Sequence, residues 1–343
     1  MPSSWMIRAG RQSLYFEIFR TEKFVSVGWA EAGNLSGFHN RKALAAHLRL
    51  VFSDYTEQMA IVAAGQLFRF VKEIKIGDQV VTYDGGARTY LCGRITGDYV
   101  FDPKQEIDGL SNRRTVDWEK ERSRDDLSQT ARNTLGSTLT LFQIPESVSG
   151  ELWADGSLNE AARFETDLPG TPTDSTASET LASLATATSQ EIEDQASERI
   201  KDRVAKLNWE QMQELVAALL RAMGYVTRVS KRGADRGKDI EASLDGFGFV
   251  EPRVIVEVKH RSGRMGAPEI RSFLGGRKPH EKSLYVSTGG FTQEAYYEAE
   301  RASIPIKLLD NDGLITALLG SYSKLDETTR RLLPLKQIYW PST

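Results

Sequence analysis

The sequence predicts two folded domains: a β-rich N-terminal domain shaped as a small barrel, and an α/β C-terminal domain with a mixed central sheet. Three observations support this prediction. A length of 343 residues fits about two domains. The first 146 residues hold short apolar stretches separated by Gly-Asp and Gly-Gly turns, a pattern typical of barrel strands. Residues 207–320 alternate strands with helices, and a strand–helix–strand unit implies a right-handed parallel crossover.

The elements of the N-terminal domain follow from turn residues and apolar spacing. A strand is expected at 23–29, and a single helix from Arg41 to Ala64 whose apolar face carries Leu44, His47, Leu48 and Val51. Further strands are expected at 77–86, 88–101, 112–121 and 137–144.

The C-terminal domain is expected to open with a helix capped by Asn208, because Gln211 stands three residues later as in a capping box. Its buried stripe should end before Gly224 and contain Trp209, Met212, Val216, Leu219, Leu220 and Met223. The elements expected next are a helix from Pro268 to Leu274, a strand at 283–288, a helix at 292–302, a strand at 304–309 and a helix at 314–320.

Composition marks the boundaries. Residues 147–206 are acidic, rich in Ser, Thr and Ala, and contain Pro169 and Pro172, which is the composition of a flexible linker. The later part, from Glu179 to Val204, is expected to be helical. The tail, 321–343, ends in apolar residues that are expected to dock. The predicted organisation is therefore a domain at 1–146, a linker at 147–206, a domain at 207–320 and a tail at 321–343.

Several functional classes are disfavoured. The chain has no long apolar stretch and no signal peptide at its start, so a cytoplasmic protein without a membrane partner is expected. Its single cysteine, Cys92, excludes an internal disulfide and a Cys-rich zinc site, and the four histidines lack metal-ligand spacing. Residues 233–238 break the P-loop spacing, so no nucleotide triphosphate is expected as a partner.

Charge is distributed unevenly. The net charge is −3, but residues 164–198 contribute −8, and the rest of the chain carries +5. Between Arg228 and Lys282 there are 13 basic and 8 acidic residues, which favours a surface for a phosphate backbone over the alternative of an ordinary solvated face. The expected DNA-backbone contacts are Arg232, Arg236, Lys238 and Arg261.

A predicted hairpin carries the chemistry. Asp239 opens one strand, Asp245 to Gly248 form the connection, and the second strand ends in Glu257-Val258-Lys259. Side chains alternate along a strand, so Glu257 and Lys259 share a face, and the hairpin brings Asp239 close to it. Asp239 and Glu257 are the predicted metal ligands, since two carboxylates with backbone carbonyls suit Mg²⁺. Lys259 is the expected partner of the attacking water or of the phosphate oxygens, and the predicted reaction is phosphodiester hydrolysis.

The alternative for this hairpin is an ion pair on an exposed sheet. The tripeptide E-x-K occurs by chance, as Glu73-Ile74-Lys75 shows in this same chain. The wider sequence argues for a site, because five segments follow one another in a recognisable order: LNWEQMQELVAALLRAMGY, GADRGKD, VIVEVKHR, SLYVSTGGFTQEA and IPIKLLDNDGL.

Over residues 207–320 these segments resemble the Mrr-type restriction endonuclease domain of the PD-(D/E)xK superfamily. The resemblance implies a restriction-endonuclease-like fold with Asp239, Glu257 and Lys259 as the catalytic D…E-x-K, although many members have Gln where this chain has Glu257. The family's first helix usually carries an acidic residue. Here Met212-Gln213 stand in its place, so Gln213 is a candidate supporting residue, whereas Glu214 would need a helix rotation of about 100°.

The N-terminal domain resembles PUA/EVE-like domains. The resemblance lies in Trp29, 34–36, 76–78, Tyr83, 93–99 and 114–118. It implies reading of a modified nucleobase extruded between aromatic walls, for which the candidates are Trp29, Tyr83, Tyr99 and Trp118. The arginines that could hold phosphates are Arg88, Arg94, Arg113 and Arg114. The alternative is that these aromatic residues fill the barrel core.

The sequence thus favours a Mg²⁺-dependent, modification-dependent (type IV-like) DNA endonuclease of host defence, homodimeric at least on DNA, with modified cytosine preferred over modified adenine as the signal. One alternative is a nucleic-acid-binding defence or regulatory protein whose nuclease-like fold does not cut. Another is an RNA-directed nuclease, because the barrel family also binds RNA.

Overall fold

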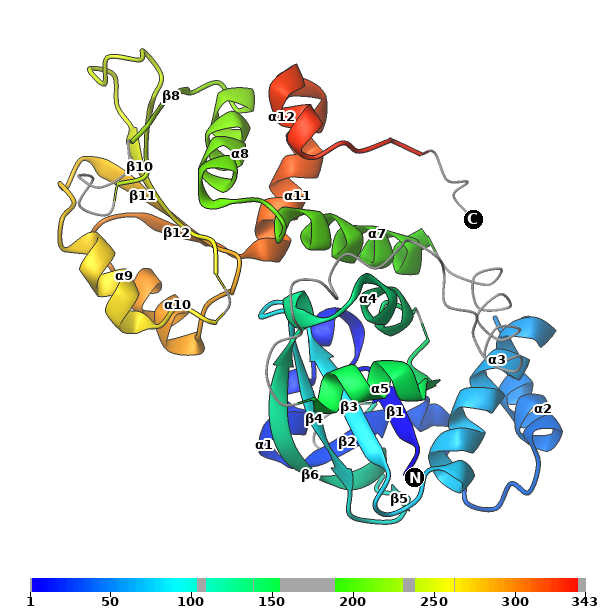
Figure 1. The fold of residues 1–343 in the computed structure, drawn as a ribbon. Coiled ribbons are helices and arrows are strands. Elements are labelled where there is room, and N and C mark those ends of the chain that lie inside the picture. Colours follow the sequence, from blue (N-terminus) through cyan, green and yellow to red (C-terminus); the bar gives the residue numbers. More distant parts are fainter. Residues whose placement is uncertain are drawn as a thin grey trace. The chain divides into compact units, whose positions relative to one another are not determined.

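The computed structural model describes residues 2–103, 109–137, 139–154, 189–230, 238–261 and 263–338. The chain divides into two compact units, unit 1 at Met1–Gln195 and unit 2 at Ala196–Thr343 (Figure 1). The two-domain layout of the predicted fold class is therefore present. Among the helices of the described ranges, none is both long and apolar enough to cross a membrane.

Unit 1 is built on a seven-stranded sheet with the order β2-β6-β4-β3-β1-β7, to which β5 adds beside β6. Only the β1–β3 pair is parallel among the pairs described. The strands are β1 (Ser4–Ile7), β2 (Phe24–Val27), β3 (Gln79–Asp84), β4 (Thr89–Ile95), β5 (Val100–Phe101), β6 (Asn112–Ser123) and β7 (Leu141–Ile144). The predicted strands are found, and β1 is an addition.

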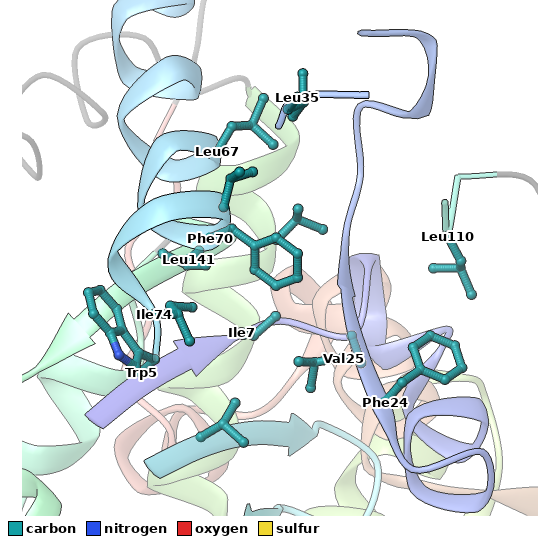
Figure 2. Packing of buried hydrophobic residues seen from close by; sticks show 14 of the residues in the cluster. Trp5, Ile7, Phe24, Val25, Leu35, Leu67, Phe70, Ile74, Leu110 and Leu141 are labelled. Carbon is teal, nitrogen blue, oxygen red and sulfur yellow. The ribbon is translucent and has the colours of Figure 1, made fainter. Parts of the chain in front are cut away.

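Both faces of this sheet are covered. Strand alternation sends Val80 and Leu91 into one core and Val81 and Cys92 into the other. The first core packs against α1 (Phe16–Thr21), α2 (Arg41–Val51) and α3 (Glu57–Phe68), and Figure 2 shows Phe70 at its centre. The second packs against α4 (Gln129–Leu135) and α5 (Glu146–Trp153). Helix α5 occupies the start of the segment expected to be linker.

The single helix predicted from Arg41 to Ala64 is wrong, because α2 and α3 are separate helices. Phe52 has an extended backbone that ends α2. Thr56 then caps α3, its hydroxyl accepting the Met59 N–H at 3.2 Å. A side-chain cap offers the backbone an alternative to a continuous helix, and this break brings Phe52 and Tyr55 into the first core.

Unit 2 has a five-stranded mixed sheet with the order β12-β11-β10-β9-β8. The strands β10, β11 and β12 are parallel, whereas β9 and β8 are antiparallel to their neighbours. Their bounds are β8 (Val226–Val229), β9 (Ile240–Ser243), β10 (Arg253–Lys259), β11 (Glu281–Ser287) and β12 (Ile306–Leu309). The mixed sheet predicted for the C-terminal domain is confirmed.

Helices cover both faces of this sheet as well. On one face, Val256, Val258 and Val286 pack with α8 (Trp209–Ala222) and α11 (Asn311–Ser321). On the other, Ile255 and Tyr285 pack with α9 (Ala267–Leu274) and α10 (Gln293–Glu300). Helix α7 (Ser189–Val204) agrees with the helix expected from Glu179 to Val204 over residues 189–204, and the first part of that expectation lies outside the described residues.

The capping box predicted at Asn208 and Gln211 is confirmed. Of the predicted stripe, Met212, Val216, Leu219 and Leu220 are buried, but Met223 is 59% exposed. Met223 is the C-cap, so it lies beyond the last turn that packs, and Gly224 follows with a φ of 97°.

Two connections extend what the sequence indicated. The β9–β10 connection runs from residue 244 to 252 and is longer than the Asp245–Gly248 turn. In it the Asp245 carboxylate accepts the N–H groups of Gly248, Phe249 and Val250. In the tail, α12 (Glu327–Leu332) leads to Leu333, which is buried in the core formed with α8 and α11, and Leu335 packs against that core. Ile338 is 74% exposed, and residues 339–343 lie outside the described ranges, so the expected docking of the tail holds only for its first part.

A close backbone contact holds the strand ends of unit 2 together. A Cβ on Gly289 would overlap the Gly263 carbonyl oxygen and lie 2.8 Å from that of Arg261, whereas one on Gly276 would meet open space. We predict that Gly289→Ala destabilises the β10–β11 ends by about 1–3 kcal/mol, because an overpacked backbone must shift. Hydrogen exchange of β10 and β11 amides in the full chain measures this, with Gly276→Ala as control. Equal exchange in both variants would contradict the contact.

Candidate active site

Asp239 lies immediately before β9 and continues its pairing with β10. Its N–H donates to the Val256 carbonyl at 2.9 Å. Its Oδ2 accepts the Val258 N–H at 2.6 Å, and the residue is only 7% exposed. The carboxylate is therefore held against β10 at the residue between Glu257 and Lys259.

Glu257 and Lys259 lie on one face of β10, since Val256 and Val258 face the opposite core. The Lys259 Nζ is 2.5 Å from the Glu257 Oε1. Glu257 is buried, while the Lys259 side chain is 36% exposed. The structure thus brings together the three residues predicted from the sequence, with a buried carboxylate instead of a pair lying on an open surface.

This donor set suits a hard divalent cation. Asp239 and Glu257 supply two carboxylates from adjoining strands, and no group of three or more His, Cys, Asp or Glu side chains able to hold a metal occurs among the described residues. A cation here would complete its coordination with backbone carbonyls, water or substrate phosphate. Mg²⁺ is commonly bound in this way, because it keeps several waters and takes one or two carboxylates.

Tyr285 is the register partner of Glu257 on β11, so its side chain lies on the same face of the sheet as Glu257. Burial raises the pKa of Tyr285 above its usual value, and the charges of Glu257, Glu269 and Asp239 raise it further, against a smaller opposing effect of Arg261. The raised pKa keeps Tyr285 neutral in the presence of these charges.

The two candidate residues of α8, Gln213 and Glu214, differ in burial and in their contacts. Gln213 is 1% exposed, and its Nε2 has no hydrogen-bond partner among the residues that the structure describes. Glu214 lies at the surface, where it forms an ion pair with Arg221 at 2.5 Å. Gln213 is thus the buried member of the pair, and Glu214 is engaged elsewhere.

Only two of the four predicted DNA-backbone residues can be placed. Lys238 is partly exposed, with its Nζ 3.9 Å from Glu241, and Arg261 donates to the Met265 sulfur at 3.4 Å. Arg232 and Arg236 lie outside the described residues, as does the turn flanked by Gly233 and Gly237.

In unit 1 the structure connects two of the four aromatic candidates. The Tyr99 hydroxyl donates to the Asn112 Oδ1 at 2.7 Å, and the Asn112 Nδ2 donates to the Gly28 carbonyl beside Trp29 at 3.2 Å. The Trp29 Nε1–H donates to the Tyr55 hydroxyl at 2.8 Å. Trp29 and Tyr99 are both half-buried at the edge of the first core.

The other two aromatic candidates lie apart from this pair. Tyr83 is buried on the opposite face of the sheet, with its ring centroid 4.6 Å from that of Tyr90. Trp118 packs on the first face, but its Nε1–H donates to the Phe19 carbonyl at 2.8 Å. Tyr83 therefore cannot share a pocket with Trp29 and Tyr99.

Sequence reasoning missed Phe52 and Tyr55, because both fell inside the predicted long helix. Their rings stack with centroids 4.9 Å apart, next to Trp29. The signal that could have found them is the Asp54-Tyr55-Thr56 segment, where Thr56 is a helix N-cap.

The arginines proposed for phosphate contacts are engaged within unit 1. Arg88 is buried and pairs with Asp125 at 2.5 Å. Arg114 is also buried and donates to the carbonyls of Phe70, Val71 and Gly97. At the surface, Arg94 pairs with Glu119 at 2.6 Å, and Arg113 lies 4.0 Å from the Phe24 ring centroid. Arg88 and Arg114 therefore have structural contacts, and the other two are the more accessible.

Two family models match separate parts of the chain. Residues 204–318 match the Mrr catalytic-domain family, described as a restriction endonuclease, and residues 5–145 match a domain of unknown function, DUF8426. No curated protein matches the chain.

Two solved structures are weakly similar. The DNA modification-dependent restriction endonuclease AspBHI is 14% identical with a TM-score of 0.32, over 80% of this chain and 72% of that chain. The MspJI restriction endonuclease in complex with a 27-mer oligonucleotide is 12% identical with a TM-score of 0.27, over 91% of this chain and 73% of that chain.

Residues 204–318 are thus a restriction endonuclease domain of the Mrr type. The chain that carries it is a DNA endonuclease, a hydrolase of phosphodiester bonds.

Proposed function

We propose that this endonuclease is Mg²⁺-dependent, with Asp239 and Glu257 as metal ligands and Lys259 as the residue that assists hydrolysis. The observation that supports this most directly is the convergence of the three side chains at the carboxyl end of β10, with Glu257 buried beside Asp239. When bound, Mg²⁺ would supply charge neutralisation and a more acidic water.

The chain's own residues have distinct tasks in this proposal. The Val258 N–H donates to the Oδ2 of Asp239 and so fixes this carboxylate against β10. Glu257 is fixed by its burial on the β10 face. Lys259 is partly exposed, so its ammonium can contact the attacking water or the phosphate oxygens as charge develops on them.

The alternative of a nucleic-acid-binding protein that does not cut is weaker on physical grounds. Two neighbouring buried carboxylates, of which Glu257 is paired with the Lys259 ammonium, are costly, and apolar residues would serve a purely structural role at least as well. Retaining Asp239, Glu257 and Lys259 together is explained by chemistry. An RNA-directed nuclease remains a second candidate on the barrel resemblance alone and would show itself by cleaving RNA in the assay below.

We predict that Asp239→Asn, Glu257→Gln and Lys259→Met each reduce DNA cleavage in Mg²⁺ by about a thousandfold or more, since each removes a charge used in the transition state. DNA binding should persist. Asn is preferred to Ala at position 239 because its amide oxygen can still accept the Val258 N–H. Cleavage of plasmid DNA and a gel-shift assay measure the two properties.

The second E-x-K supplies the control for this set. Glu73 belongs to unit 1, where it pairs with Arg41 at 2.7 Å. Glu73→Gln should cut at the wild-type rate. A variant at 239, 257 or 259 that retained near-normal cutting would remove that residue's assignment.

Unit 1 is proposed as the sensor, a PUA/EVE-like reader that restricts cutting to DNA with a modified base, cytosine being preferred. The nuclease domain has no evident sequence reader of its own, and unrestricted cutting would destroy the host genome. The half-buried cluster of Trp29, Tyr55 and Tyr99 offers aromatic faces of the kind that stack an extruded base. Because 147–206 has linker composition, cuts should fall at varied distances from the base.

We predict that wild-type protein cleaves cytosine-modified duplexes preferentially, and that Trp29→Ala or Tyr99→Ala erases this preference without unfolding unit 2. Cleavage of matched modified and unmodified duplexes measures it. Tyr83→Phe, on the opposite sheet face, is the control and should keep the preference. Equal cleavage of both duplexes by the wild type would leave a nuclease without a sensor.

The active form is proposed to be a homodimer, which forms on DNA if it does not form before DNA binds. One catalytic site hydrolyses one strand, so a double-strand break in a single binding event requires two sites. We predict that sedimentation velocity shows two chains on a cleavable duplex in Ca²⁺. A monomer on DNA that breaks both strands without rebinding would contradict this.

A further inference from the structure

The face of the sheet that carries Glu257 and Lys259 continues onto β11. Pairing of β10 with β11 places Ser283 beside Ile255, Tyr285 beside Glu257, and Ser287 beside Lys259. Partners in a parallel pair have side chains on the same face. Ser287 is thus the register partner of Lys259 on β11 and shares its face of the sheet.

The Ser287 hydroxyl is buried without a hydrogen-bond partner among the described residues. The whole side chain of this serine is 0% exposed. Buried hydroxyls are normally paired, because leaving one unpaired is destabilising. A hydroxyl kept in this condition beside a lysine of the site requires an explanation.

The neighbouring hydroxyl cannot serve the same purpose. Thr288 Oγ1 already contacts His260 Nδ1 at 3.2 Å and the Lys259 carbonyl at 3.4 Å. The Thr288 N–H donates to that carbonyl at 3.0 Å and ties the end of β11 to the end of β10. The backbones of Ser287 and Lys259 are therefore adjacent independently of their side-chain contacts.

The Lys259 ammonium contacts Glu257, one of the proposed metal ligands. A divalent cation on that carboxylate would repel the ammonium at short range and displace it from the Oε1. The displaced ammonium then needs another acceptor close to the same position, because a free lysine would lose its orientation toward the scissile phosphate.

We propose that Ser287 is a positioning residue. Its hydroxyl accepts a hydrogen bond from the Lys259 ammonium when a divalent cation binds the Glu257 carboxylate. This inference rests on the proposed metal-dependent function. In the metal-free state Lys259 neutralises Glu257, and in the loaded state Ser287 holds Lys259 for the reaction. Cation binding and lysine placement are thereby coupled.

The test uses the full chain without DNA, titrated with Mn²⁺ and followed by the electron paramagnetic resonance signal of free Mn²⁺. Ser287→Ala should weaken Mn²⁺ binding about fivefold, the effect of one modest hydrogen bond, because the ammonium then stays on Glu257. Ser283→Ala is the matched control. It removes another buried and unpaired Oγ on the same strand face, beside Ile255, and should bind Mn²⁺ as the wild type does.

A double-mutant cycle separates positioning from a general structural effect. Lys259→Met removes the competing ammonium, so Ser287→Ala should have no further effect on Mn²⁺ binding in that background. Both serine variants should unfold at or above the wild-type temperature, since each loses an unpaired hydroxyl. Ser287→Cys, nearly isosteric and a weak acceptor, takes the place of Ser287→Ala if the latter does not fold.

Three results would overturn the proposal: unchanged Mn²⁺ binding in Ser287→Ala, an equal loss in Ser283→Ala, or an undiminished Ser287→Ala effect in the Lys259→Met background. These failures are distinct from failure of the proposed function. If the wild type neither binds Mn²⁺ nor cuts DNA in Mg²⁺, both are overturned. If it does both, only the role of Ser287 is in question.

Discussion

The hydrogen bond from the Val258 N–H to the Asp239 carboxylate is the contact on which the catalytic arrangement depends. It exists because β9 pairs antiparallel with β10 in a register that sets Val256 opposite Ile240, so the preceding residue, Asp239, reaches Val258. A shift of one residue would turn every side chain of β10 to the other face, placing Glu257 and Lys259 in the aliphatic core. The strand register therefore determines whether the three side chains can form a site.

The strand β10 has two different environments because unit 2 has helices on both sides of its sheet. Even-numbered valines pack with α8 and α11, and this core makes the strand rigid. The odd-numbered face is apolar only at Ile255, under α9 and α10, and becomes polar toward the carboxyl end of the strand. Ligand sites at the carboxyl ends of parallel strands are common in α/β sheets. Here β10 carries Glu257 and Lys259, and its parallel neighbour β11 places Tyr285 beside Glu257.

Unit 1 applies the same principle to a larger sheet. Its two faces are both covered by helices, which leaves polar groups in the interior that must be satisfied. Asn112 does this at the end of β6, joining Tyr99 to the backbone beside Trp29, and Arg114 does it for the carbonyls around Phe70. Several aromatic residues at the margin of the first core stay half-buried, among them Trp29 and Tyr99, and the break between α2 and α3 adds Phe52 and Tyr55.

From the sequence alone came most elements of the nuclease domain, its mixed sheet and the grouping of Asp239, Glu257 and Lys259, whereas strand β8 and helix α12 were not predicted. These follow from local signals: a capping box at Asn208, period-two alternation in β10, and glycines at turns. Short-range rules were enough because the hairpin is contiguous in the chain. They failed at residues 52–56, where a side-chain cap competes with helix continuation and neither local pattern decides the outcome.

Only the tertiary structure decided which distant residues meet. That Tyr83 faces away from Trp29, that Arg88 and Arg114 are buried among backbone and carboxylate partners, and that Ser287 lies beside Lys259 all depend on pairing between strands far apart in sequence. Composition shows that an aromatic, an arginine or a serine is present. Which face it occupies, and whether its polar group finds a partner, is set by strand register and by the helices that close over the sheet.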